Sequence, residues 1–225
     1  MWPKSCAELE PRTTPVEPRT DPWRCHARAR VPSRRKPILQ RKRHVAKPST
    51  LFNFEIDLSD SDRGLYETLA LRVPCHPSEG PEYFVARVLA YCLEFTEGLT
   101  FGKGLAEPNE PALSVRDLTG QLQAWIEIGA PDARRLHKAS KAAPRVVVYT
   151  HKDPALLLKQ WEGERIHRAE ALELYSLDRA LIDRVAQALT RRMTFELSVS
   201  GGHLYLTLGD ELLTGEVRRH ALAES

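Results

Sequence analysis

The stretch RDLTGQLQAWIEIGAPDARRLHKASKAA, residues 116–143, decides the fold of this chain. It begins with an aspartate ahead of a short turn, continues as an apolar strand that carries one glutamate, and ends in a basic helix. Side chains along a strand alternate between its two faces. One face of residues 121–129 therefore carries Trp125, Glu127 and Gly129, and the other carries Ala124, Ile126 and Ile128.

The glutamate of this strand needs a partner, because burying an unpaired charge is costly. Asp117 is the nearest acid that could share a ligand with Glu127, since the turn at residues 118–120 could place both on adjacent antiparallel strands. Two close carboxylates would repel each other unless a divalent cation bridged them. In the alternative, Asp117 starts a turn and Glu127 pairs with Arg134 or Lys138. Spacing alone favours this structural interpretation.

Three segments carry a resemblance to a known family. They are HPSE at residues 76–79, the run at residues 109–143, and VVVYTHK at residues 146–152. Together they resemble the YaeQ family of bacterial proteins over residues 47–208, a domain-sized length. The resemblance implies a variant of the restriction-endonuclease-like PD-(D/E)XK fold. In that fold an aspartate and a strand glutamate bind magnesium, and a lysine assists phosphodiester hydrolysis.

The resemblance also implies the residues of the site. Asp117 takes the first acidic position and Glu127 the second, so these two would hold Mg²⁺, for which Mn²⁺ could substitute. Gly129 stands where the family pattern has a lysine, two residues after the glutamate. Gly129 leaves room on the glutamate face, so a lysine of the basic helix is expected to stand in, with Lys138 favoured over Lys141.

Other polar residues are secondary candidates. Glu110, in a proline-containing segment, is a second candidate ligand. Glu79 would either approach the metal or cap a helix that begins near Pro77, and capping is favoured. His76 is expected to close the start of the same helix, because no second histidine lies at metal-ligand spacing.

Charge is distributed unevenly along the chain. The first 50 residues hold 13 Lys and Arg against 4 Asp and Glu, so residues 51–225 carry a net charge of −6 within a total of +3. Residues 1–46 are predicted to be a disordered basic extension, because so few apolar residues cannot offset the entropy of ordering. They would act as a nucleic-acid-binding arm or arise from an upstream start codon, and the second origin is favoured.

The remaining pattern predicts a mixed α/β fold, with a restriction-endonuclease-like core sheet flanked by helices and an additional β-hairpin near each end. Strands are expected at residues 51–58, 68–73, 99–105, 112–118, 121–129, 145–150, 172–175, 194–200 and 203–208. Helices are expected at residues 77–97, 131–143, 154–161 and 178–191. A single domain would cover residues 47–209, and residues 210–225 would form a tail.

Two functions are predicted from these observations. In the first, the chain is a magnesium-dependent phosphodiesterase or nuclease in which Lys138 offsets the negative charge that develops on the phosphate. In the second, it is a catalytically degenerate member of the same fold that binds protein or nucleic acid. Lacking a signal-peptide core and an apolar stretch of about 20 residues, the chain is expected to be a cytoplasmic monomer with no membrane partner.

Overall fold

The computed structural model describes residues 49–103, 107 and 109–222. These residues belong to one compact unit, residues 45–225. The predicted basic extension, residues 1–46, lies outside the described residues, so its disorder stays a prediction. Within the described part of the chain, no helix is long and apolar enough to cross a membrane.

Ten strands and four α-helices make up the described residues. The strands are β1 (Thr50–Asp60), β2 (Leu65–Cys75), β3 (Leu99–Phe101), β4 (Leu113–Arg116), β5 (Leu122–Ile128), β6 (Arg145–Thr150), β7 (Leu172–Leu177), β8 (Arg192–Ser200), β9 (His203–Leu208) and β10 (Glu211–His220). The helices are α1 (Pro81–Leu93), α2 (Ala133–Ala142), α3 (Pro154–Trp161) and α4 (Arg179–Gln187), with one 3-10 turn, η2 (Ala169–Ala171). Mixed α and β structure is thus confirmed.

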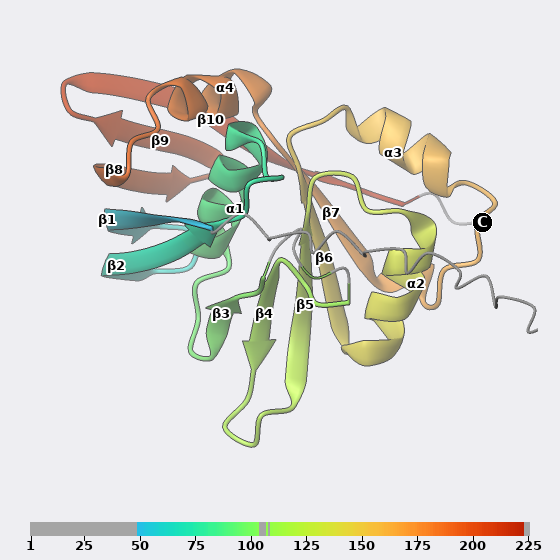
Figure 1. Cartoon of the computed structure of the whole chain (residues 1–225). Helices are drawn as coiled ribbons and strands as arrows, with labels where there is room; N and C mark the ends of the chain where they lie inside the picture. Colours follow the sequence, from blue (N-terminus) through green and yellow to red (C-terminus); the bar gives the residue numbers. More distant parts are fainter. Residues whose placement is uncertain (1–48, 104–106, 108, 223–225) are drawn as a thin grey trace, which may run out of the picture. The chain divides into compact units, whose positions relative to one another are not determined.

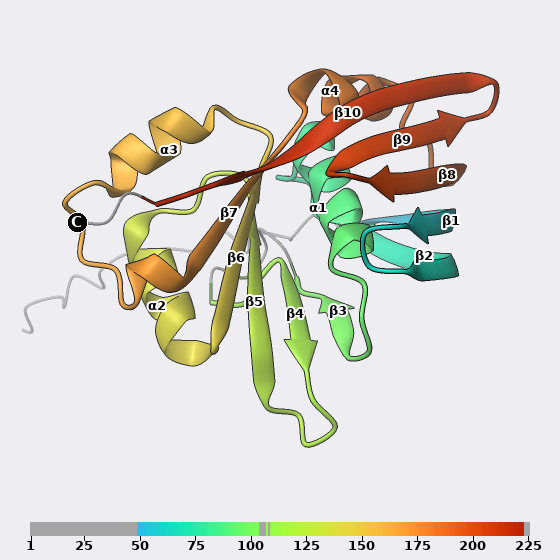
Figure 2. The same ribbon diagram turned by 180° about the vertical axis from the view of Figure 1, so that it is seen from behind.

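All ten strands join one sheet in the order β2-β1-β8-β9-β10-β7-β6-β5-β4-β3. The sheet is strongly curved and nearly closed, and α1 lies on its concave side (Figures 1 and 2). The two predicted hairpins are present as β1–β2 and β8–β9. The structure does not show the predicted restriction-endonuclease-like core, because the strands form one barrel-like sheet around a helix.

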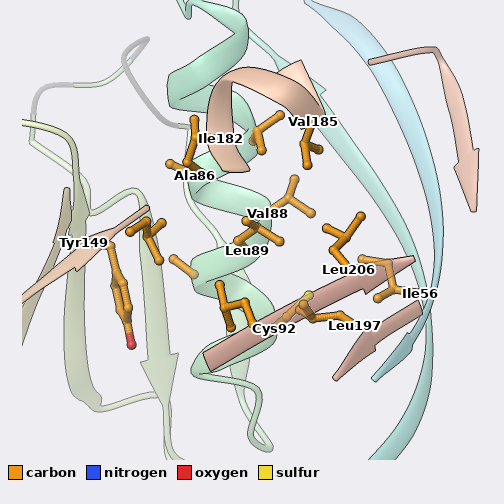
Figure 3. Packing of buried hydrophobic residues seen from close by; sticks show 14 of the residues in the cluster. Ile56, Ala86, Val88, Leu89, Cys92, Tyr149, Ile182, Val185, Leu197 and Leu206 are labelled. Carbon is orange, nitrogen blue, oxygen red and sulfur yellow. The ribbon is translucent and has the colours of Figure 1, made fainter. Parts of the chain in front are cut away.

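The main core fills the inside of this sheet. Helix α1 contributes Ala86, Val88, Leu89 and Cys92, which Figure 3 shows between Tyr149 of β6 and side chains of the opposite strands. Ile182 and Val185 of α4 close one end of this cluster (Figure 3). Helix α1 is buried around most of its circumference, as expected of a helix enclosed by a sheet.

A second core covers the outside of β5, β6 and β7. Its buried members include Trp125, Leu136, Val148, Trp161 and Leu174, so α2 and α3 pack against this face of the sheet. Strands β5 and β6 are therefore buried on both faces, which explains their nearly continuous apolar sequences. The predicted division of β5 into two faces is confirmed, since Trp125 lies in the outer core while Ile126 lies in the inner core.

Strand β10 corrects the prediction of a C-terminal tail at residues 210–225. It pairs with β9 through residues 211–216 and with β7 through residues 217–220, so it joins the two halves of the sheet. Only Leu213 of the strand is buried, and this weak apolar pattern hid it. Gly215 lets α4 approach closely, because a Cβ there would lie 2.9 Å from atoms of Asp178 and Leu181.

Candidate functional site

A cavity of about 600 Å³ lies at the carboxyl ends of β5 and β6. Strands β5, β6 and β7 are parallel neighbours, so their carboxyl ends meet at one edge of the sheet, where open α/β sheets commonly bind ligands. The first residues of α1 and α2 complete the wall. The ionisable side chains that line the cavity are Glu82, Tyr83, Glu127, Asp132, Arg135, His151 and Lys152.

Glu127 is the buried acid of this cavity, with 2% of its surface exposed. Trp125 Nε1 and Arg135 Nε donate hydrogen bonds of 2.5 Å and 2.7 Å to its Oε1 atom. Burial raises the pKa of Glu127, and the Arg135 guanidinium is the main influence that opposes this rise. Glu127 therefore has a cationic partner from the basic helix, as the structural interpretation expected, but this partner is Arg135 and not Arg134 or Lys138.

Helix α2 explains why Arg135 makes this contact. Asp132 caps the helix by accepting a hydrogen bond of 2.7 Å from the Arg135 backbone N–H, which fixes the first turn beside the end of β5. Arg134 is exposed, and Lys138 Nζ donates instead to Asn109 Oδ1 at 2.6 Å. Arg135 Nη2 also donates to the Glu110 carbonyl at 2.7 Å.

Tyr83 occupies the space beside Gly129. A Cβ on Gly129 would lie 3.5 Å from Tyr83 Cδ2, and the backbone there has a φ of +85°, which favours glycine. Burial raises the pKa of the Tyr83 hydroxyl, which keeps it protonated. A Cβ at this position would make only ordinary van der Waals contact with the Tyr83 ring, so it is the left-handed φ that disfavours a side chain at Gly129 itself.

His151 and Lys152 follow the last residue of β6 and line the same cavity. His151 is 8% exposed, and its Nδ1 atom has no hydrogen-bond partner in the described structure. Burial is the main cause that lowers the His151 pKa, and the nearby Lys152 charge adds to it. Sequence reasoning assigned these residues no role. The available signal was a polar pair directly after a strand with the apolar run Val146–Val148, at the edge where parallel strands place ligands.

Helix α1 begins at the wall of the cavity. Its N-cap is Gly80 and its first residue is Pro81, and no side-chain hydrogen bond caps this end. Free backbone N–H groups at a helix N-terminus carry a partial positive charge. The helix starts four residues later than Pro77, because residues 77–80 form a turn and only Pro81 occupies the first helical position.

Asp117 lies far from this cavity, at the tip of the β4–β5 hairpin. Its Oδ1 accepts hydrogen bonds of 2.9 Å from the backbone N–H groups of Thr119 and Gln121, and its Oδ2 accepts one of 2.6 Å from Gln123. These bonds, with that of the Thr119 hydroxyl foremost, lower the Asp117 pKa. Asp117 pairs with Gln121, so six residues of strand, about 20 Å, separate it from Glu127. The structure does not bring the two carboxylates together.

The remaining candidates also lie elsewhere. Lys138 and Lys141 do not line the cavity at Glu127, and the Glu110 carboxylate pairs with Lys103 at 3.1 Å. Glu79 pairs with Arg87 at 3.1 Å in a buried position ahead of the Gly80 N-cap.

Two further predictions concerned His76 and a bound metal ion. His76 Nδ1 contacts the Ser78 hydroxyl at 2.6 Å, which is a local turn contact. Across the residues that the structure describes, no group of three His, Cys, Asp or Glu side chains could hold a metal ion.

Known proteins are similar to this chain in sequence and in fold. Residues 45–217 match the YaeQ protein family. A protein of Escherichia coli K12 described as "Uncharacterized protein YaeQ" is 28% identical over 165 residues, which cover 72% of this chain and 91% of that protein.

Two solved structures are similar over most of the chain. The YaeQ protein from Pseudomonas syringae has a TM-score of 0.70 and 28% identity, and the match covers 77% of this chain and 97% of that one. The YaeQ protein from Xanthomonas axonopodis pv. citri has a TM-score of 0.70 and 29% identity over 78% of this chain and 99% of that one. With sequence and fold in agreement over one domain, the chain belongs to the YaeQ family.

Proposed function

We propose that the cavity at the carboxyl ends of β5 and β6 binds the phosphate group of a ligand. One observation carries the proposal: Arg135 already neutralises the buried Glu127, while Lys152 has no ion-pair partner among the described residues. Lys152 therefore offers a ligand one cation that has no ion-pair partner among the described residues, in a lining that also carries the acids Glu82 and Asp132. A phosphate carries the complementary charge.

The start of α1 supports the same ligand. Gly80 lines the cavity at the uncapped end of a 13-residue helix, and backbone N–H groups at such an end favour anions. His151 adds a neutral imidazole, since its pKa is lowered. A neutral imidazole can accept a hydrogen bond from a ligand hydroxyl at one ring nitrogen and donate one at the other.

Titration calorimetry with inorganic phosphate and pyrophosphate tests this proposal. Lys152→Gln should weaken binding about tenfold or more, because a hydrogen bond to a charged group contributes roughly 1.5–3 kcal/mol. Lys159→Gln, an exposed lysine of α3 outside the cavity, is the matched control and should bind like the parent. Equal affinities for all three proteins, or no binding by the parent, would reject the phosphate site.

A magnesium-dependent phosphodiesterase is the second candidate. It is favoured by the Glu127 carboxylate, which receives both of its described hydrogen bonds on Oε1 and so retains Oε2 for a ligand. Glu82 and Asp132 line the same cavity. Mg²⁺ is commonly held by one or two carboxylates together with phosphate oxygens. These residues therefore fit an ion that arrives with the phosphate better than a resident ion held by Asp117 and Glu127.

The roles of the chain's own residues follow from their positions. Glu127 would hold the ion, Lys152 would contact the phosphate in place of Lys138 or Lys141, and His151 would accept a proton. A bound ion of this kind supplies polarisation of the phosphoryl oxygen and a water of lowered pKa. Without the ion, the same cavity would bind a phosphate-containing ligand but would not cleave it.

Metal titrations with and without pyrophosphate distinguish the two candidates. The phosphodiesterase requires that pyrophosphate strengthen Mg²⁺ or Mn²⁺ binding, that Glu127→Gln abolish this effect, and that the parent cleave DNA or RNA. Phosphate binding without metal dependence and without cleavage would leave the binding function alone. A stability measurement should accompany Glu127→Gln, because this change also removes the ion pair with Arg135.

A further inference from the structure

A second cavity, of about 470 Å³, lies between the carboxyl-terminal half of α2 and the segment that joins α3 to β7. We call its basic lining residues the α2 basic surface: His137, Lys141, Arg165, His167 and Arg168. The remaining lining residue is Ile166, and no acidic side chain lines this cavity. It is separate from the cavity at Glu127, with which it shares no residue.

The charges of this surface are not neutralised by the protein. Among the described residues, no carboxylate lies within ion-pair distance of Lys141 or Arg165, whereas Arg145 pairs with both Glu94 and Glu173. Residues 51–225 carry a net charge of −6, so unpaired cations around one hollow do not reflect a generally basic domain. A concave surface of one charge concentrates counterions of the opposite charge.

Arg168 fixes the two sides of the surface relative to each other. Its Nη2 atom donates to the carbonyls of Ser140 and Ala143 at 2.9 and 3.0 Å, at the carboxyl end of α2. This cation also offsets the negative end of the helix dipole, which would otherwise disfavour an anion there. Lys141 and Arg165 are therefore presented from two segments that are tied together.

We propose that the α2 basic surface binds the phosphodiester backbone of a nucleic acid. Arg134 and Lys141 are both exposed and lie seven residues apart on one side of α2, about 10 Å along the helix axis. One strand of a duplex presents a phosphate about every 3.4 Å of its axis, so about three phosphates span this distance. The site needs neither the cavity at Glu127 nor any catalysis.

A nucleic acid fits this surface better than a membrane does. Surfaces that lie on bilayers combine their cations with an apolar face that enters the lipid. Here only Ile166 accompanies five basic residues, and the cations surround a hollow. A backbone phosphate can enter a hollow, whereas a flat bilayer surface cannot follow it.

Fluorescence anisotropy of the full chain with short labelled DNA, single-stranded and duplex, tests the proposal over a range of salt concentrations. Lys141→Gln/Arg165→Gln should weaken binding at least about tenfold and should reduce the slope of log Kd against log salt by about 2, or roughly one per lost contact. The control Lys159→Gln/Arg191→Gln removes two exposed cations outside this cavity and should preserve both quantities. The basic residues 1–46 are present in every variant, so they cannot produce the difference.

Crosslinking of the bound DNA, followed by peptide mapping, gives a local readout. Crosslinks should fall on α2 and residues 165–168. The proposal is overturned if the double variant and the control lose the same affinity, or if crosslinks map only to residues 1–46. It is also overturned if binding to anionic phosphatidylglycerol vesicles depends on Lys141 and Arg165 while binding to DNA does not. Phosphate binding by Lys152→Gln tests the cavity at Glu127, and DNA binding by Lys141→Gln/Arg165→Gln tests the α2 basic surface, so the two proposals fail independently.

Discussion

Arg135 sets the chemical state of Glu127. Its guanidinium and the Trp125 indole both bind Oε1, and they oppose the rise in the Glu127 pKa that burial causes. The ion pair is only partly screened by water, because the side chain of Arg135 is 23% exposed and that of Glu127 is 3% exposed. A carboxylate held in this way needs no metal ion to be stable in the core.

Gly129→Lys is expected to destabilise the domain rather than to restore a catalytic lysine. A left-handed φ costs a residue with a side chain roughly 1–2 kcal/mol. The added Cβ would lie 3.5 Å from Tyr83 Cδ2, in ordinary contact, so the rest of the lysine side chain must also extend past this ring. Gly120→Lys is the matched control, because Gly120 has a φ of +83° but nothing within 4 Å of its would-be Cβ. Urea denaturation should show the larger loss for Gly129→Lys. Equal losses would mean that Tyr83 does not restrict this position.

His151 should make stability depend on pH. Its folded-state pKa lies below the unfolded value of about 6.5, so the unfolded chain binds more protons in this range. The contribution of His151 to the free energy of unfolding is therefore fully present above a pH of about 6.5, and it is lost as the pH falls through the folded-state pKa. Thermal melts over this range should show a smaller pH dependence for His151→Asn than for the parent. His167→Asn, at an exposed position, should behave like the parent, and an unchanged slope for His151→Asn would contradict the prediction.

At the scale of the element, β10 holds the two halves of the sheet together. It is antiparallel to both β9 and β7, which have no other link to each other in the strand order. The halves also share α1 and the inner core, but in the strand order of the described residues they are connected through β10 alone. Loss of β10 would expose the inner edges of β7 and β9, with their unpaired backbone groups.

A chain that ends at Gly209 should therefore fail to give a cooperatively folded domain. Truncation after Leu222 is the control, since it retains the whole of β10. Circular dichroism and thermal melting of both proteins measure the effect. A chain ending at Gly209 that melts like the control would show that the segment is a dispensable tail after all.

Gly215→Ala gives a milder test of the same element. The added Cβ would lie 2.9 Å from atoms of α4, and such overpacking costs about 1–3 kcal/mol. Gly215 does not have a left-handed φ, so its effect reports packing between β10 and α4 alone. Chemical denaturation measures the loss of stability, and a neutral substitution would mean that α4 is free to shift.

At the scale of the whole molecule, the described residues belong to one compact unit, residues 45–225. The family match begins at residue 45. A chain that begins at residue 45 should therefore keep the melting temperature of the full chain, because the core is built from residues 54–213. Differential scanning calorimetry of the two chains measures this, and a fall of several degrees would show that the extension stabilises the domain.

The sequence by itself determined the local structure. Alternating apolar residues located β1, β5, β8 and β9, and the helix expected at residues 154–161 has the observed bounds of α3. The same periodicity assigned Trp125 and Glu127 to one face of β5, and composition assigned the glutamate a buried position that needed a cation. These features depend on neighbours within a few residues, which the sequence displays directly.

Only the tertiary structure decided which distant residues meet Glu127. Its cavity takes Tyr83 from α1, Arg135 from α2 and His151 with Lys152 from the end of β6, while Asp117 remains at a hairpin tip about 20 Å away. The order of the strands in the sheet and their register determine which residues surround Glu127. Neither can be read from the periodicity of a single segment. The β10 strand shows the same limit, because its place between β7 and β9 stabilises it more than its own apolar pattern does.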